Sequence, residues 1–231
     1  NAGLRELRSI EDKSGMRSLS WLRFARALAG NLVDNSRLSE AETLYEQVHQ
    51  GVLEHKECGS DSFEALEVLN GIGELRLKQR RSEDATLVYG RALAGMRVLQ
   101  ARHPDTFDPD LTREKSAELL RRTASGSVPQ ASARFQLEAA SLVALNGLGN
   151  AAVQGKEFVK AEDCYQQCVA GRKLLLGTEH EDTLKVLNDL AGLRLREKKP
   201  VDAERLFRQV LEGNENLLGT NDPRTLNTVN S

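Results

Sequence analysis

Ala161-Glu-Asp-Cys-Tyr165 is one of four copies of a short pattern in which an aromatic ring follows an alanine after three intervening residues. The other copies are Ala41-Glu-Thr-Leu-Tyr45, Ala85-Thr-Leu-Val-Tyr89 and Ala203-Glu-Arg-Leu-Phe207. The alanines are separated by 44, 76 and 42 residues. Residues at i and i+4 lie on the same face of a helix. Recurrence at a period of about 40 residues indicates stacked copies of one helical unit rather than a single globular core.

A second pattern precedes each alanine and predicts another helix. Its copies are Leu66-Glu-Val-Leu-Asn-Gly-Ile-Gly73, Leu142-Val-Ala-Leu-Asn-Gly-Leu-Gly149, Leu184-Lys-Val-Leu-Asn-Asp-Leu-Ala191 and the weaker Leu22-Arg-Phe-Ala-Arg-Ala-Leu-Ala29. Each unit therefore consists of a helix A, a tight turn and a helix B. Helices A are predicted over 21–34, 62–78, 141–154 and 182–197, and helices B over 38–56, 82–100, 157–176 and 200–217.

Small residues recur inside helix A, and two of them, Gly73 and Gly149, are glycines. A glycine in a helix interior costs roughly 1 kcal/mol relative to alanine, so its repeated use predicts a packing role. We expect close contact with the alanine of helix B, while the ring fills the gap toward the next unit. Gly177 and Gly219 are expected to end helices in the left-handed conformation. His103 and His180, which recur in the linkers, are expected to be turn and capping residues.

These patterns resemble the tetratricopeptide repeat, in particular the variety of roughly 42 residues found in kinesin light chains. In that variety an LNNLA helix, an A-E-x-L-Y helix and an LG-x-x-HP-x-T linker follow one another. The resemblance covers about residues 20–106 and 141–231. It implies an all-α fold, a right-handed α-solenoid of stacked antiparallel helix pairs. It also implies that Asn70, Asn146, Asn188 and Asn230 contact a bound peptide, as the matching asparagines of kinesin light chain repeats do.

The spacing of the repeats predicts five segments. They are a remnant of a preceding helix or linker (1–20), repeats 1 and 2 (21–106), a degenerate repeat or helical insertion (107–140), repeats 3 and 4 (141–224), and the start of a further helix (225–231). The last segment, Thr225-Leu-Asn-Thr-Val-Asn230, matches the opening of the preceding helix A. We therefore expect the chain to be part of a longer array.

Composition favours a thin helical array with much solvated surface. Of 231 residues 29% are charged and 4% aromatic, and the net charge is −2. No clustered basic face indicates nucleic-acid binding, and no run of about 18 apolar residues predicts a membrane span. Three cysteines form no disulfide framework. Cys164 and Cys168 are expected to be small buried side chains, and Cys58 a loop thiol. A reducing compartment such as the cytoplasm fits best, with any targeting signal outside this segment.

No recognisable arrangement of residues predicts catalysis. Gly147-Leu-Gly-Asn-Ala-Ala152 matches a dinucleotide-binding fingerprint, which works only where it follows a strand and opens a helix. Here it lies inside an amphipathic helix, so helix packing is the better interpretation. His49 and His55 have acidic neighbours but are expected to lie on an exposed polar face. The sequence therefore predicts a protein that is not an enzyme and needs no cofactor or metal.

Helices A line the concave side of such arrays, so their exposed stripe is the predicted binding site. Helical periodicity assigns to it Arg23, Arg26, Glu67, Asn70, Glu74, Asn146, Asn150, Gln154, Lys185, Asn188, Arg196 and Asn230. A carboxamide both donates and accepts, so a row of asparagines can bind an extended backbone. The alternative is that these amides bond within their own or a neighbouring helix. Lys185 and Arg196 predict a basic end, and Glu67 and Glu74 an acidic one.

The predicted function is a protein–protein interaction module or scaffold that binds a protein or an extended peptide in its groove. Two alternatives remain at this stage. The chain can be a structural subunit packed permanently within a large multiprotein assembly. It can also be the sensor end of a larger signalling ATPase whose active domain lies elsewhere. An interaction module that binds its partner reversibly keeps a solvated polar groove, whereas a permanent subunit of an assembly buries one face extensively.

Overall fold

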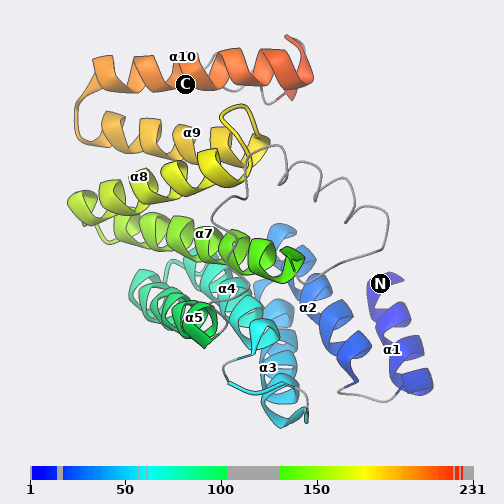
Figure 1. Ribbon diagram of the computed structural model, residues 1–231. Coiled ribbons are helices and arrows are strands. Elements are labelled where there is room, and N and C mark those ends of the chain that lie inside the picture. The colour runs from blue at the N-terminus through cyan, green and yellow to red at the C-terminus, as the bar shows by residue number, and fades with distance from the viewer. Residues whose placement is uncertain are drawn as a thin grey trace. The chain divides into compact units, whose positions relative to one another are not determined.

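The computed structural model describes residues 2–14, 18–56, 58–60, 62–102, 131–220, 222, 223 and 225, and these residues contain helices and no strand (Figure 1). The helices are α1 (Ala2–Ser14), α2 (Leu19–Asp34), α3 (Leu38–Glu54), α4 (Phe63–Lys78), α5 (Ser82–Arg102), α7 (Ala131–Gln154), α8 (Phe158–Leu175), α9 (Glu181–Arg196) and α10 (Pro200–Leu218). The predicted all-α fold is confirmed.

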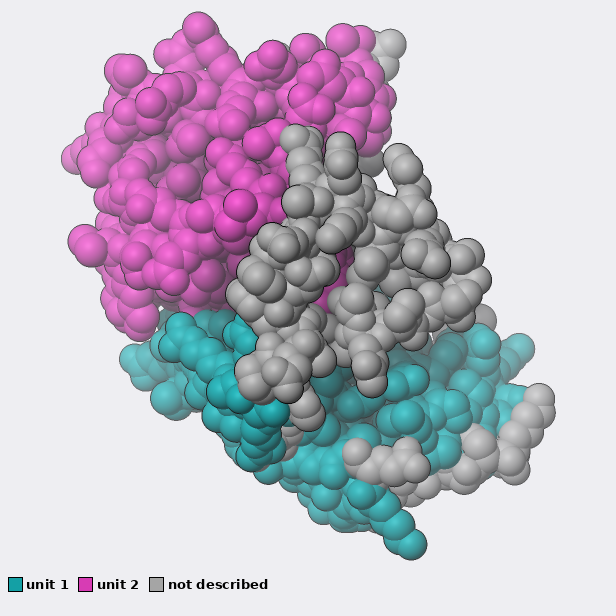
Figure 2. All heavy atoms as spheres, viewed as in Figure 1, with its two compact units in different colours: residues 1–104 teal, residues 105–231 magenta. Residues whose placement is uncertain are grey.

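The chain divides into two compact units, unit 1 (1–104) and unit 2 (105–231), coloured separately in Figure 2. In unit 1, helix A of each repeat packs on its helix B, as α2 does on α3 and α4 on α5, and α3 packs on the following α4. In unit 2, α7 packs on α8, α8 on α9 and α9 on α10. Each unit is therefore built as predicted, from antiparallel helix pairs stacked in chain order as in an α-solenoid.

Helix ends agree with the periodicity to within two residues, with one exception. The exception is α7, which begins at Ala131, ten residues before the predicted start of its helix A. The surplus segment 107–140 therefore contributes its last ten residues to α7. Residues 103–130, which include His103, lie outside the described part of the chain, and so does Asn230. The division into five segments stays a prediction.

The turns between helices A and B share one conformation in all four repeats. A left-handed residue, with φ between 60° and 62°, occupies the same turn position as Ser36, Arg80, Lys156 and Lys198. In the last of these turns the Lys198 N–H donates to the Leu195 carbonyl (3.0 Å) and the Lys199 N–H to the Arg194 carbonyl (2.9 Å). These two bonds define a Schellman motif, which satisfies the last carbonyls of the helix. Lys156 takes this position although Gly155 directly precedes it.

The linkers between repeats in unit 2 also repeat one geometry. Gly177 and Gly219 have positive φ of 100° and 85°, as predicted for glycines at helix ends, but Gly219, with a ψ of 166°, lies outside the left-handed helical region. The Thr183 hydroxyl donates to the Gly177 carbonyl (2.8 Å), and the Thr225 hydroxyl to the Gly219 carbonyl (2.9 Å). His180 is the N-cap of α9, as predicted, because its Nδ1 accepts a hydrogen bond from a backbone N–H of the first turn.

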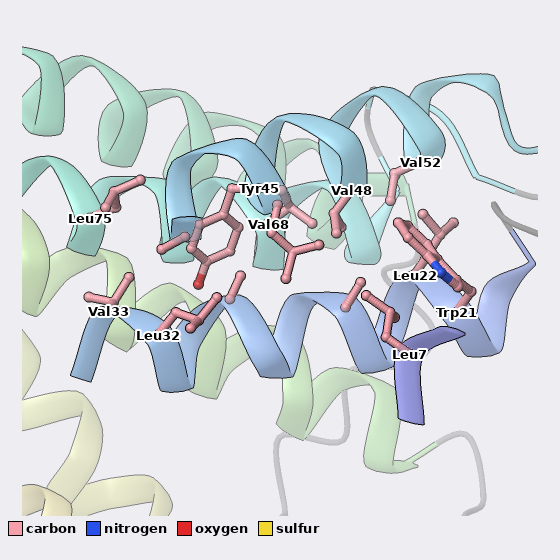
Figure 3. Close-up of a cluster of buried hydrophobic side chains, with 14 of the residues drawn as sticks. Leu7, Trp21, Leu22, Leu32, Val33, Tyr45, Val48, Val52, Val68 and Leu75 are labelled. Atoms are coloured by element: carbon pink, nitrogen blue, oxygen red, sulfur yellow. The ribbon is translucent and has the colours of Figure 1, made fainter. Parts of the chain in front are cut away.

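The packing of the small residues agrees with the prediction only in part. A Cβ added at Gly73 would lie 2.6 Å from the Tyr89 ring, and one at Gly149 would lie 2.5 Å from the Tyr165 ring, so these two rings lie over the glycine of their own helix pair. The Tyr45 ring instead lies against Gly71 of the following helix A, as predicted. In unit 1 Tyr45 belongs to the buried cluster shown in Figure 3, beside Leu32 and Val33 of α2.

The cysteines of helix α8 contribute to packing, as predicted. Cys164 and Cys168 are buried, and the three cysteines of the chain form no disulfide. The Cys168 thiol donates to the Leu142 carbonyl (3.3 Å), and burial raises its pKa to about 11. A thiol with so high a pKa is present mainly as the unreactive protonated form at neutral pH. Cys58 lies in the loop before α4 and packs against the core of unit 1.

Candidate partner-binding face

The exposed stripe of helices A is called here the helix-A face. In unit 1 its two arginines are paired with glutamates of the following helix A. Arg23 on α2 reaches Glu64 on α4 at 2.9 Å, and Arg26 reaches Glu67 at 3.1 Å. These ion pairs link two consecutive helices A. Burial raises the pKa of Glu67, and the Arg26 charge acts in the opposite direction. The acidic end predicted at Glu67 is therefore offset by a neighbouring arginine.

The other two predicted residues of unit 1 differ sharply in accessibility. Asn70 is 8% exposed and is part of the buried face of α4. Glu74, one turn further along the helix, is exposed. A ligand on this face can therefore reach the Glu74 carboxylate, whereas it meets little of the Asn70 amide.

Two of the asparagines in unit 2 bond within the protein. The Asn146 amide donates from Nδ2 to Oδ2 of Asp189 on α9 (3.4 Å), and its Oδ1 is buried with no donor among the described residues. Asn150 accepts a hydrogen bond from the Tyr165 hydroxyl at 2.6 Å. These two amides thus form hydrogen bonds to neighbouring helices. This is the alternative to peptide binding that the sequence left open.

Helix α9 presents the candidate residues that are available to a partner. Lys185 and Arg196 are exposed, and neither joins a described carboxylate in an ion pair. Asn188 is half-buried and makes no side-chain hydrogen bond to a described residue. Gln154, at the end of α7, is also exposed. The helix-A face of unit 2 therefore has two cations available where unit 1 has paired ones.

Two charged residues beside this face, Asp189 and Arg172, are not among the residues that the sequence predicts for it. Asp189 lies one helical turn from Lys185, and its pKa is raised by burial against the opposing effects of Asn146 and Lys185. Arg172 on α8 is buried, and its guanidinium donates to the Asp182 carbonyl at the start of α9 (2.7 Å). In the first two repeats the position of Asp189 is occupied by Ala27 and Gly71, and that of Arg172 by Val52 and Met96. A charged side chain at a position that is otherwise small or apolar is therefore the signal in the sequence.

The described residues contain no group of three or more His, Cys, Asp or Glu side chains placed to hold a metal ion. Across the same residues, no helix is both long enough and apolar enough to cross a membrane.

Comparison with known proteins gives one family match, to the tetratricopeptide repeat, over residues 140–228. No curated protein matches the chain. The crystal structure of BtubC (BKLC) from P. vanneervenii is similar, with a TM-score of 0.66 and 17% identity over 98% of this chain and 76% of that one. Two structures of a Podosopora anserina putative kinesin light chain with nearly identical TPR-like repeats have identities of 22% and 21% and TM-scores of 0.36 and 0.35. Each match covers 85% of this chain, and 95% and 96% of theirs.

Proposed function

We propose that the helix-A face of unit 2 binds an extended peptide segment of a protein partner, because residues 140–228 match the tetratricopeptide repeat, a repeat that typically mediates protein–protein interactions. Repeats of this type typically have no enzymatic activity of their own. The observation that carries the proposal is the exposure of Lys185 and Arg196 without ion-pair partners among the described residues.

The contrast between the two units supports the choice of α9. Arg23 and Arg26 in unit 1 are held by Glu64 and Glu67, so an incoming carboxylate must compete with internal ones. Neither Lys185 nor Arg196 forms an ion pair in the described part of unit 2, although the Lys185 charge acts on Asp189 one helical turn away. Complementary charge accelerates association and suppresses the wrong orientation of a ligand. We therefore expect the acidic end of the peptide to lie over α9.

The Asn188 amide completes the proposed contact. It lies between the two cations along α9 and is half-buried, so its side chain is ordered by packing but still accessible. A carboxamide can accept from a peptide N–H and donate to a peptide carbonyl at once. Asn188 would thus bind the peptide backbone, while Lys185 and Arg196 would bind its acidic side chains.

The test selects peptides from a random library on the purified chain and measures the affinity of a selected peptide by fluorescence anisotropy. We expect enrichment of Asp and Glu. Lys185→Gln, Arg196→Gln and Asn188→Ala should each weaken binding roughly three- to tenfold, and the loss for the two cation variants should shrink at high salt.

Two variants serve as matched controls. Gln209→Ala removes an exposed amide from α10, and Arg23→Gln removes a cation that is already paired within unit 1. Neither should change the affinity. Peptides without acidic enrichment, or equal losses in the control variants, would place the binding surface elsewhere on the chain.

A further inference from the structure

Helix α5 of unit 1 has an apolar stripe on its solvent side. Leu87 is 73% exposed and Val98 is 44% exposed, and Gly90 and Ala94, which lie between them in the sequence, are exposed as well. Spacings of three and four residues place these four positions, called here the α5 stripe, on one face of the helix. The residues that α5 buries lie on the opposite face, at Ala85, Tyr89, Ala92 and Met96. The α5 stripe therefore faces away from the core of its own repeat.

The same four positions of helix B are polar in most of the other repeats. Counted from the alanine of each helix B, they are Thr43, Glu46, Gln50 and Glu54 in repeat 1, and Arg205, Arg208, Glu212 and Asn216 in repeat 4. In repeat 3 they begin with the polar pair Asp163 and Gln166 and end with Ala170 and Leu174. Single exposed apolar residues are common on protein surfaces, whereas a continuous apolar stripe indicates a contact surface. Repeat 2 is therefore set apart by a helix B whose outer face is apolar along its length.

Gly90 has no packing role inside its own unit. A Cβ added at Gly90 would meet no atom within 4 Å, whereas one at Gly73 or Gly149 would meet a tyrosine ring. Glycine weakens a helix interior relative to alanine, so its use at an open position calls for another reason. Together with Ala94 one turn later, it leaves a shallow surface between Leu87 and Val98. A second helix can approach such a surface closely, because the distance between packed helices depends on the side chains at the contact.

The charges at the two ends of α5 make the helix complementary to an antiparallel copy of itself. The first turn contains the acidic Glu83 and Asp84, and the last turn contains the basic Arg102. If two copies of α5 lie antiparallel, the acidic turn of each lies opposite the basic turn of the other. The same register sets Leu87 of one copy opposite Val98 of the other. A parallel pair would instead bring like charges together, which is unfavourable.

We propose that two copies of this chain associate through their α5 stripes, as an antiparallel helix pair about a two-fold axis. A two-fold contact uses the same patch on both copies, so a stripe with opposite charges at its ends can be its own complement. A contact through one helix pair lies at or below the low end of the roughly 1,200–2,000 Å² that a stable interface buries. The dimer should therefore be weak and dissociate in the micromolar range. It uses a helix B, so it is independent of the peptide binding proposed for the helix-A face.

Sedimentation velocity of the intact chain over a series of micromolar concentrations tests the association. We expect the sedimentation coefficient to rise with concentration from that of a monomer toward that of a dimer. Leu87→Glu puts a carboxylate into the contact and should weaken association at least about tenfold. Leu174→Glu is the matched control, because Leu174 on α8 is 80% exposed and lies outside the α5 stripe, and it should leave association unchanged. A chain that stays monomeric throughout would overturn the proposal in favour of a different protein partner, and equal effects of the two variants would overturn the assignment to α5.

Charge variants at the two ends of α5 test the antiparallel orientation. Glu83→Arg and Arg102→Glu each set like charges against each other in an antiparallel pair, and each should weaken association roughly threefold. The double variant restores opposite charges and should associate as the parent does. Circular dichroism checks that every variant keeps the helical content of the parent. Single charge variants without effect, or a double variant weaker than either single one, would contradict the antiparallel pair.

Discussion

The guanidinium of Arg194 on α9 donates hydrogen bonds to both carboxylate oxygens of Glu162 on α8, one of them at 2.9 Å, and so joins helix A of one repeat to helix B of the preceding one. Unit 1 contains the same arrangement, in which Arg76 on α4 pairs with Glu42 on α3. Each arginine also donates a hydrogen bond to the residue just after its own helix. Arg194 donates to Glu197 and Arg76 to Gln79, both at 2.8 Å. These two ion pairs therefore link consecutive repeats at equivalent positions.

Glu162→Gln should destabilise the fold in a pH-dependent way. The hydrogen bond from Arg194 lowers the pKa of Glu162 below its ordinary value. A carboxyl whose pKa is lower in the folded than in the unfolded state stabilises the fold at pH values above its unfolded pKa, about 4.3. This stabilisation is lost as the pH falls through the folded-state pKa. Urea unfolding should therefore show a loss of roughly 1–2 kcal/mol at neutral pH, and little difference from the parent in strong acid.

Arg208→Gln is the control for this ion pair. It breaks the pair between Arg208 and Glu204, whose side chains are 78% and 61% exposed, whereas those of Arg194 and Glu162 are 14% and 26% exposed. Exposed pairs contribute little because water screens them. Equal effects of Glu162→Gln and Arg208→Gln would contradict a stabilising role for the less exposed pair.

Gly149→Ala and Gly192→Ala should shift the melting temperature in opposite directions. The methyl group added at Gly149 would lie 2.5 Å from the buried Tyr165 ring, so the ring must move, at a typical cost of about 1–3 kcal/mol. A methyl group at Gly192 of α9 meets no atom within 4 Å, and alanine improves helix propensity by up to about 1 kcal/mol. Thermal unfolding followed by circular dichroism distinguishes the two, and a stabilising Gly149→Ala would refute the tight contact.

Asn150→Ala should cost stability, and Tyr165→Phe should restore it. The single change leaves the buried Tyr165 hydroxyl without its acceptor, which typically costs about 1–3 kcal/mol. The double variant removes both partners, as in the fourth repeat, where Phe207 and Gly192 occupy these positions. Guanidinium unfolding of the two single variants and the double variant gives the coupling energy. Additive losses would show that the Asn150 amide does not support the ring.

Lys198→Gly should stabilise the fold, although it removes a charged side chain from an exposed turn. Lys198 has φ of 61°, a conformation that costs a non-glycine residue about 1 kcal/mol or more. Part of the gain is offset by the greater freedom of glycine in the unfolded chain, which leaves roughly 0.5 kcal/mol. Calorimetry should show a higher melting temperature. Lys199→Gly, at a φ of −110°, is the matched control and should show no gain.

The accessibility of the predicted groove residues could not be read from periodicity. Spacing placed Asn70, Asn146, Asn150 and Asn188 on one stripe, yet they differ in the structure. Asn70 is buried, Asn146 bonds Asp189, Asn150 bonds Tyr165, and Asn188 makes no side-chain bond to a described residue. Helical periodicity shows only which side chains lie on the same face of one helix. Packing against the neighbouring helices determines which of these side chains a partner can reach.

The sequence by itself determined the helices of the four repeats and their ends, apart from the start of α7, because these depend on local interactions. The apolar periodicity, the positive φ at Gly177 and Gly219 and the cap at His180 each act within a few residues, and the structure confirms them. The tertiary structure decided which groups meet across repeats. Asn146 and Asp189 are 43 residues apart and Arg194 and Glu162 are 32 apart, so only the stacking of helices brings them together. The same stacking placed the Tyr165 ring over Gly149 and left Lys185 and Arg196 without internal ion-pair partners in the described chain. Side-chain contacts between distant residues depend on how helices pack, which no local pattern records.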